Sequence, residues 1–214
     1  MTIRASGDTM LLVEWDGSID PVVNQRAITL AQRLRHRLGS QVRDIVPSYC
    51  AIGVHYDPLL TDLAALERAI EEESDALGEQ PLIPDGAPVD LVVRYGGADG
   101  PDLTAVAEWA QCSTAEVIER HSAMHYRVYM LGFVPGFAYL GRVDARIAAP
   151  RHRMPRERVA AGSVGIAGEQ TGVYPMATPG GWQVIGRTDA VMFDSQRMQP
   201  SLLQPGDMVR FVPA

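Results

Sequence analysis

The feature that most limits the possible folds is the spacing of glycine and proline after Tyr126. From there to the end of the sequence, short runs of β-forming residues alternate with turns rich in these two residues. Such runs are too short for ordinary helices, and their regular interruption is typical of a compact β-barrel or β-sandwich. The runs that predict strands are residues 127–131, 164–167, 183–185, 190–193 and 207–212.

The N-terminal part follows a different pattern, in which two amphipathic helices are separated by β-type runs. Asp20-Pro21 is typical of a helix start, and Gly39 is typical of a helix end. The order β-α-β-β-α, which Leu82-Ile83 could close as a sixth element, predicts a ferredoxin-like arrangement. The elements are expected within residues 3–14, 22–38, 42–46, 49–56 and 61–77.

A linker is predicted at residues 81–88, because this segment holds three prolines and a glycine. We therefore expect an α+β protein with one domain at residues 1–86 and a second at residues 87–214. The second domain should open with a strand at residues 89–95, before the short β-type runs described above.

Two short helices are expected between this strand and the β-rich part, at residues 103–110 and 115–121. Ser113 and Glu116 form the sequence pattern of a capping box at the start of the second helix. The pair has the length of a helix-turn-helix, but Arg120 is the only basic residue near the second helix. Two helices that cover one end of a barrel are therefore the better interpretation.

Lysine is absent from the chain, and all 19 basic residues are arginine. The sequence therefore excludes a phosphate-binding lysine, a Schiff-base lysine and a lysine general base. Arginine stays charged and suits bidentate contacts to carboxylate or phosphate groups. A net charge of −7 argues against a nucleic-acid partner.

Targeting and covalent cross-linking signals are also missing from the sequence. The N-terminus lacks a basic stretch followed by an apolar one, and no apolar run is long enough to span a bilayer. Cys50 and Cys112 are far apart and form no CxxC pair, so reduced thiols are expected. These observations predict a cytoplasmic protein without a membrane partner.

An excess of positive charge lies between Arg142 and Arg158. This segment holds six arginines but only two acidic residues, Asp144 and Glu157, in a chain that is acidic as a whole. The excess indicates an anion site for a carboxylate or phosphoryl group, or a basic face for an acidic partner protein. The arginines are residues 142, 146, 151, 153, 156 and 158.

Three segments combine glycine and proline with aromatic residues, at 131–141, 168–175 and 178–182. The first of them breaks helix and strand patterns so often that it is not expected to form the interior of a regular element. Glycine lets the backbone approach a ligand, and aromatic rings can wall the ligand in. One such loop would be a barrel corner with an aromatic plug; three favour a ligand-facing surface.

Two other motifs suggest chemistry less strongly. His121 and His125 are spaced for one helix face, but no third metal ligand lies at a suitable distance. A single His121 at a helix end, acting as hydrogen-bond donor or base, is more plausible.

Residues 161–165 fit a relaxed nucleophile elbow around Ser163, yet no helix follows and the last histidine, His152, precedes it. A tight turn is the simpler interpretation.

The glycine and aromatic segments carry a resemblance to a known family. The runs YRVYMLGFVPGFAYLG (126–141), AGSVGIAGEQTGVYP (161–175), TPGGWQVIGRT (178–188) and LLQPGDMVRFVP (202–213) resemble the family of allophanate hydrolase subunit 1, which is also the family of the 5-oxoprolinase B-subunit. The likeness extends more weakly through VRYGGADGPDL (93–103) and the N-terminal half. Ala160 and Arg142-Val143 depart from the family pattern, outside the aromatic loops.

The resemblance implies a ferredoxin-like N-terminal domain and a cyclophilin-like β-barrel. It implies two partners, a sister protein of the 5-oxoprolinase C-subunit (allophanate hydrolase subunit 2) type and a LamB/YcsF-type A-subunit. Together these would open the lactam of 5-oxoproline to glutamate with ATP, which the partners would help to bind. Other branches of the family imply a carboxyltransferase-type subunit for urea degradation or an inhibitor of a sporulation-type histidine kinase. The barrel alone also suggests a prolyl isomerase, although a fold does not determine function.

For a small cyclic amide, the residues divide into three expected roles. The substrate carboxylate would pair with one or more of Arg151, Arg153 and Arg158. Its ring would lie against Phe133, Phe137 and Trp182, beside the backbone of Gly180 and Gly181. Hydrogen bonds to the lactam N–H and C=O would come from His121, Gln170 and Tyr174.

Overall fold

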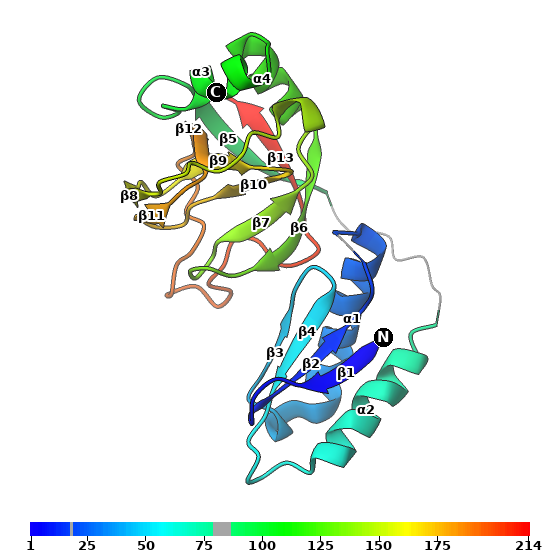
Figure 1. The fold of residues 1–214 in the computed structure, drawn as a ribbon. Helices are drawn as coiled ribbons and strands as arrows, with labels where there is room; N and C mark the ends of the chain where they lie inside the picture. Colours follow the sequence, from blue (N-terminus) through cyan, green and yellow to red (C-terminus); the bar gives the residue numbers. More distant parts are fainter. Residues whose placement is uncertain (18, 79–86) are drawn as a thin grey trace. The chain divides into compact units, whose positions relative to one another are not determined.

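The computed structural model describes residues 1–17, 19–78 and 87–214. It separates into two compact units, Met1–Ile83 and Pro84–Ala214 (Figure 1). The boundary expected after residue 86 falls at the edge of residues 79–86, which are outside the described residues. The sixth element expected at Leu82-Ile83 falls there as well.

The N-terminal unit is a four-stranded antiparallel sheet with the order β1-β2-β4-β3. Alternate residues of its strands, such as Leu11 and Val13, are fully buried against helix residues such as Leu30 and Ile70. Its elements are β1 (Thr2–Ala5), β2 (Met10–Glu14), α1 (Pro21–Leu38), the 3-10 helix η1 (Gly39–Gln41), β3 (Asp44–Pro47), β4 (Ala51–His55) and α2 (Leu63–Asp75).

The ends of α1 confirm the expected capping residues. The Asp20 carboxylate accepts hydrogen bonds from the backbone N–H groups of Val22 and Val23, at 2.8 and 3.0 Å. The N–H of Gly39 returns to the carbonyl of Arg35 at the other end. Side-chain capping at the start and glycine at the end satisfy backbone groups that the helix itself leaves unpaired.

Residues 3–14 form a hairpin where one strand was expected. The Ser6 N–H donates to the Met10 carbonyl at 2.8 Å, and β1 then pairs with β2 along the edge of the sheet. In a β-α-β-β-α-β plan, the final strand pairs with the first one in this position. Here an N-terminal strand occupies it, so the arrangement is reached with a different order of elements.

The C-terminal unit is built around a closed barrel with the strand order β10-β7-β6-β13-β5-β12-β9. Only the β13–β5 pair is parallel among the described pairings of the barrel. Strands β8 and β11 form a separate two-stranded ribbon. The elements are β5 (Val89–Tyr95), α3 (Leu103–Trp109), α4 (Thr114–Ser122), β6 (His125–Leu131), β7 (Ala138–Gly141), the 3-10 helix η2 (Ala145–Ile147), β8 (Arg156–Val159), β9 (Ser163–Ala167), β10 (Gln170–Val173), β11 (Thr178–Gly180), β12 (Gln183–Arg187) and β13 (Met208–Pro213).

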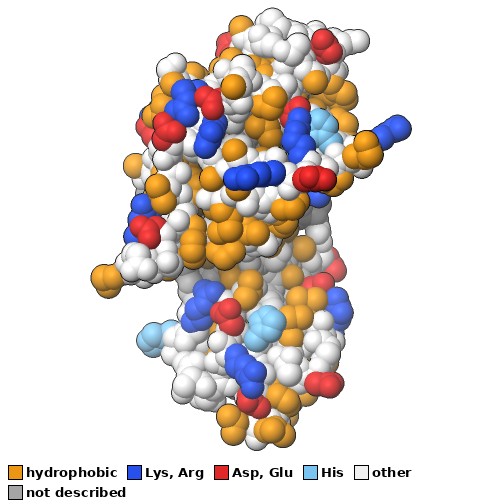
Figure 2. Space-filling model, turned by 90° about the vertical axis from the view of Figure 1, so that its left-hand side faces the viewer, with side chains coloured by type: hydrophobic (Ala, Val, Ile, Leu, Met, Phe, Trp, Pro, Cys, Tyr) orange, Lys and Arg blue, Asp and Glu red, His pale blue; other side chains and the backbone are white. Residues whose placement is uncertain are grey.

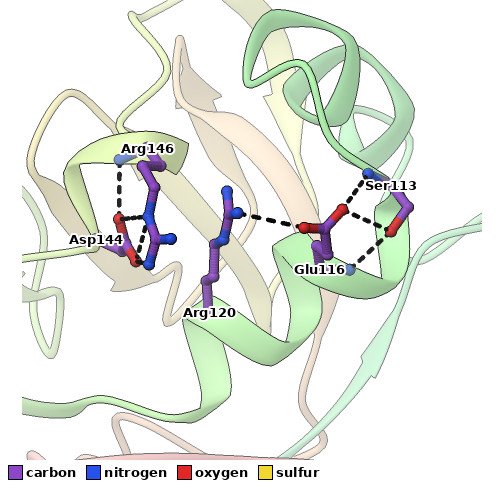
Figure 3. Close-up of polar contacts among 5 residues, drawn as sticks. All are labelled: Ser113, Glu116, Arg120, Asp144 and Arg146. Carbon is purple, nitrogen blue, oxygen red and sulfur yellow. Dashed lines mark hydrogen bonds and ion pairs between the residues drawn. The ribbon is translucent and has the colours of Figure 1, made fainter.

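Helices α3 and α4 lie at one end of the barrel and contribute Val106 and Val117 to its core (Figure 1). The predicted capping box of α4 is present, because Ser113 and Glu116 each bind the other's backbone N–H (Figure 3). Arg120 of the next turn binds Glu116 and lies between it and the Asp144–Arg146 pair of η2 (Figure 3). The hydrogen bond from Arg146 lowers the pKa of Asp144 to about 2, so this carboxylate stays charged at neutral pH.

The strand expectations for the barrel are partly wrong. Residues 190–193 form only an isolated bridge from Phe193 to Ser201. Conversely, β7 lies inside the segment 131–141, which was not expected to form a regular element, and β10 lies inside the glycine-rich segment 168–175. Glycine is used in β10 because a Cβ at Gly172 would lie 2.8 Å from the Ala138 carbonyl and 3.2 Å from the ring of Phe137. Close approach of neighbouring strands, which the sequence pattern does not reveal, explains this glycine.

The close approach at Gly172 gives a prediction about stability. Gly172→Ala should lower the free energy of unfolding by about 1–3 kcal/mol, because the added methyl group meets backbone and rings that cannot easily move. Gly181→Ala is the matched control, since a Cβ there has no neighbour closer than 3.7 Å. Urea unfolding of both variants measures the difference; equal stabilities would contradict the packing described for β10.

Candidate functional site

A cavity of about 280 Å³ lies beside the β8–β11 ribbon, where all three glycine and aromatic segments meet. Figure 2 shows the side of the molecule on which this ribbon lies in Figure 1; hydrophobic side chains and arginines occur together on the barrel unit there. We call this cavity the aromatic pocket. Its lining residues are Phe133, Phe137, Tyr139, Arg151, Pro155, Tyr174, Pro179, Gly180, Gly181 and Trp182.

Phe137 is the centre of the aromatic packing and is almost fully buried. Its ring lies 4.9 Å from that of Tyr139, 5.3 Å from Tyr174 and 5.4 Å from Trp182, measured between centroids. All three contacts are edge-to-face, an arrangement that aromatic pairs favour. The back wall of the pocket is therefore rigid and apolar.

Phe133 stands at the rim of the pocket and is 59% exposed. Its backbone has a φ of +70°, a left-handed conformation that is unfavourable for a bulky residue. Two backbone hydrogen bonds stabilise this turn. The Gly132 N–H donates to the Phe137 carbonyl, and the Phe137 N–H donates to the Val134 carbonyl. Strain of this kind occurs often where a side chain must be presented to a ligand.

The polar groups of the pocket are few, and one of them is the Tyr174 hydroxyl. Gly180 packs directly on the Tyr174 hydroxyl, which would lie 2.4 Å from a Cβ at this position. Burial raises the pKa of Tyr174 above its ordinary value, although the Trp182 backbone N–H and the charge of Arg151 oppose the shift. The hydroxyl is therefore protonated at neutral pH and able to donate a hydrogen bond.

Arg151 is the one charged residue among those that line the pocket. Its guanidinium lies over the ring of Trp182, 5.6 Å from the ring centroid. Such cation–π contacts hold a cation at an aromatic surface while its N–H groups stay available. The pocket thus combines an apolar wall with a positive charge at its edge.

The loop that carries Arg151 is tied to the barrel through Asp102, which is 5% exposed. The Asp102 carboxylate accepts hydrogen bonds from Arg156 at 2.6 Å, from the Val184 N–H at 2.7 Å and from His152 at 3.2 Å. Burial pushes the pKa of Asp102 upward, but the bonds from Arg156 and Val184 outweigh this and hold it below its ordinary value. One carboxylate therefore positions both the arginine loop and the start of β12.

The structure brings seven of the predicted site residues to this pocket, namely Phe133, Phe137, Arg151, Tyr174, Gly180, Gly181 and Trp182. It places four elsewhere. Gln170 begins β10, at the opposite end of that strand from Tyr174. Arg153 is exposed and does not line the pocket, and Arg158 lines a different cavity.

His121, the fourth, is fully buried in the barrel core and does not reach the pocket. Its Nδ1 lies 2.8 Å from the Tyr95 hydroxyl, and its Nε2 lies 2.9 Å from the Thr171 hydroxyl. Because Thr171 donates its own proton to the Gly165 carbonyl, His121 must donate from Nε2 and accept at Nδ1. Burial lowers the pKa of His121 to about 3, so the ring is neutral. His125 begins β6 and does not extend the helix, which separates the two histidines.

Ser163 also has no nucleophile-elbow context, since it is the first residue of strand β9 and no helix follows it directly. Sequence reasoning missed Tyr139 and Asp102 as parts of the site. The aromatic segment 131–141 contained a signal for Tyr139, whereas Asp102 pairs with residues about 50 to 80 positions away and has no local signal.

Comparison with known proteins identifies the family. The family model for the carboxyltransferase domain, subdomain C and D, matches residues 1–203. The chain belongs to this family. Within it, the chain is 44% identical to the 5-oxoprolinase B-subunit of Escherichia coli O157:H7, covering 97% of this chain and 93% of that one. Identity to the 5-oxoprolinase B-subunit of Bacillus subtilis (strain 168) is 38%, over 99% and 94% of the two chains.

A solved structure also resembles this member of the carboxyltransferase subdomain C and D family. The crystal structure of TTHA0988 matches with a TM-score of 0.85 and 35% identity over the whole chain. This chain spans 40% of the length of that protein. The resemblance covers both units. The α+β fold expected from the sequence is therefore confirmed. No helix among residues 1–17, 19–78 and 87–214 has the length and apolar character to cross a membrane.

The buried histidine gives a prediction about pH. His121 has a pKa of about 3 when folded but about 6.5 when unfolded, so between these values the unfolded state binds the extra proton. The free energy of unfolding should therefore fall as the pH drops below 6.5, by about 1.4 kcal/mol per pH unit from this residue. His121→Gln should be less stable at pH 7.5 but should lose this dependence, which urea unfolding at pH 7.5 and 5.5 measures. His125→Gln, an exposed control, should keep the full dependence; an unchanged pH dependence in the His121 variant would disprove the buried neutral state.

Asp102 gives a second stability prediction. Asp102→Asn should lower the free energy of unfolding at pH 7 by about 1–3 kcal/mol, because it removes a charge-assisted hydrogen bond to Arg156. The pKa of Asp102 is lower in the folded than in the unfolded protein. Its contribution to the free energy of unfolding is therefore fully present above the pKa of the unfolded state, and it is lost as the pH falls through the pKa of the folded state. The control is Asp189→Asn, since Asp189 pairs with Arg94 at an exposed site and should contribute at most about 1 kcal/mol. Equal effects of the two substitutions would show that the Asp102 contacts do not organise the loop.

Proposed function

We propose that this chain is the B-subunit of a cytoplasmic, ATP-dependent 5-oxoprolinase, in which the aromatic pocket holds the lactam substrate. The observation that carries the proposal is the combination of aromatic walls with Arg151 as the only charge in the pocket lining. The identity to the two 5-oxoprolinase proteins named above supports the choice of reaction.

The chemistry of 5-oxoproline fits these surroundings. Its ring presents apolar methylene groups, which suit the faces and edges of Phe137 and Trp182. Its carboxylate suits the guanidinium of Arg151, which can bind both oxygens at once. The lactam carbonyl needs a hydrogen-bond donor, and the protonated Tyr174 hydroxyl is the candidate donor in the pocket. A volume of about 280 Å³ is at the small end for ligand pockets, as a substrate of this size requires.

Besides Arg151, the titratable groups of the pocket are the hydroxyls of Tyr139 and Tyr174. Its lining includes no carboxylate, histidine, cysteine or serine. Opening a lactam requires activation of a stabilised amide and attack by water, and general acid–base groups normally assist both steps. We propose that a sister C-subunit, of the allophanate hydrolase subunit 2 type, and a LamB/YcsF-type A-subunit supply these groups when they join this chain.

ATP is assigned to the complex and not to a site in the aromatic pocket. The chain has no lysine, and the pocket lining offers one guanidinium without a glycine-rich phosphate loop that begins a helix. These residues do not fit a nucleotide. The role proposed for this chain is therefore to orient the lactam by its ring and carboxylate.

The test is turnover by the reconstituted three-protein complex, assayed as glutamate and ADP formed from 5-oxoproline. Arg151→Gln should lower kcat/KM about 10- to 100-fold, equivalent to about 1.5–3 kcal/mol for a charge-assisted contact. Arg142→Gln is the matched control, because its exposed pair with Glu169 is 3.5 Å long and lies outside the pocket lining. It should retain wild-type activity.

A substrate that lacks the carboxylate shows whether Arg151→Gln impairs recognition of the carboxylate or lowers the activity of the complex in general. The wild-type complex should prefer 5-oxoproline to 2-pyrrolidone, and the Arg151→Gln complex should lose most of this preference. If the variant complex keeps the wild-type preference for 5-oxoproline over 2-pyrrolidone, Arg151 does not bind the substrate carboxylate. No turnover of 5-oxoproline by the complete complex, together with turnover of urea when a biotin system is supplied, would instead support a carboxyltransferase-type subunit.

A further inference from the structure

A second cavity, of about 180 Å³, shares no lining residue with the aromatic pocket. It lies where β8, β12 and the turn before β9 meet the loop that follows β5. We call it the arginine pocket. Its lining residues are Ala98, Asp99, Pro101, Arg156, Arg158, Val159, Ala160, Ser163, Val184 and Arg187.

Three guanidinium groups converge on this cavity from two strands. Arg156 and Arg158 are two positions apart on β8 and therefore project from the same face of the strand. Arg187 is at the end of β12, and its Nε donates to the Ala161 carbonyl at 2.9 Å, which fixes the side chain. The only acidic residue in the lining, Asp99, is already bound by Arg94 at 2.9 Å. The lining thus holds three arginines against one acidic residue, in a chain of net charge −7.

The hydrogen-bonding capacity of these arginines is not used up by the protein. Nη2 of Arg156 binds Asp102, but its Nη1 is buried and has no hydrogen-bond partner in the described structure. Arg158 forms no hydrogen bond or ion pair with any other described residue. A buried donor without a partner, such as Nη1 of Arg156, is rare in native proteins and calls for a water, ion or ligand beside it. Arg158 is exposed, so its guanidinium is available to solvent or to a ligand.

Ser163 adds a neutral hydroxyl to the same cavity. It is 4% exposed at the start of β9 and has neither the following helix nor a histidine partner that a nucleophile would need. A hydroxyl beside several guanidinium groups is instead suited to donate to an oxyanion.

We propose that the arginine pocket binds a phosphate group, held by Arg158 and Arg187 with Arg156 and Ser163 as additional donors. The paired N–H groups of a guanidinium match the oxygens of a phosphate group. Three guanidinium groups offer more donors than the two oxygens of a single carboxylate can accept. The cavity has room for an inorganic phosphate ion or for one terminal phosphoryl group of a larger molecule, but not for a whole nucleotide. The site is separate from the proposed lactam site and does not depend on the proposed reaction.

Calorimetric titration of the full chain with inorganic phosphate, at constant ionic strength, tests the proposal. Saturable binding should weaken about tenfold or more in Arg158→Gln and in Arg187→Gln, because each loses a charge-assisted contact. Arg68→Gln makes the same charge change on α2 and should bind phosphate as the wild type does. Because Arg158 is exposed, Arg158→Gln should leave the melting temperature unchanged. The test therefore stays valid even if the Arg187 variant is unstable.

Competing ligands identify the source of the phosphate. Displacement of phosphate by ATP indicates a nucleotide-borne phosphoryl group, whereas phosphate binding that ATP does not affect indicates the free ion. Acetate at the same concentration should not compete. The proposal is overturned if phosphate does not bind saturably, if acetate binds as well, or if neither arginine variant changes the affinity. Binding of acetate would favour a docking site for acidic side chains of a partner protein, whereas unchanged affinity in both variants would mean that phosphate binds outside the arginine pocket. The assay needs no turnover, so its failure would leave the 5-oxoprolinase proposal standing.

Discussion

A buried carboxylate, that of Asp102, joins three segments that are far apart in the sequence. It binds the start of β12 through the Val184 N–H, the ribbon strand β8 through Arg156, and the loop between η2 and β8 through His152. Both cavities lie beside these segments, since Arg151 and Trp182 line one and Arg156 and Val184 line the other. Because buried ion pairs require good geometry to offset desolvation, the pairing also fixes the orientation of the segments that it joins.

Local signals in the sequence were sufficient for the helices and for part of the site. Asp20 and the Ser113–Glu116 pair act within one helical turn, so their capping roles could be predicted and are found in the structure. The aromatic pocket could be anticipated because three separate segments shared the same unusual composition. Their convergence on Phe137 is the reason that most of the predicted substrate-binding residues meet in one place.

The rest depends on contacts between residues that are distant in the sequence. Gly172 lies in a strand because neighbouring strands leave no space for a Cβ, although glycine in isolation indicates a turn. His121 ends a helix in a position typical of an exposed functional residue, but Tyr95 and Thr171 enclose it in the core. Arg158 belongs to the same basic segment as Arg151 and yet lines another cavity, because β8 carries it away from the pocket rim.

The hydrogen bonds through His121 have a consequence for proton movement in this protein. The series from Tyr95 through His121 and Thr171 to the Gly165 carbonyl runs in one direction and ends on an acceptor that cannot pass a proton onward. With the His121 ring neutral, the direction of donation along this series is fixed at neutral pH. None of these four residues lines the aromatic pocket, so the series does not carry a proton to or from a ligand bound there.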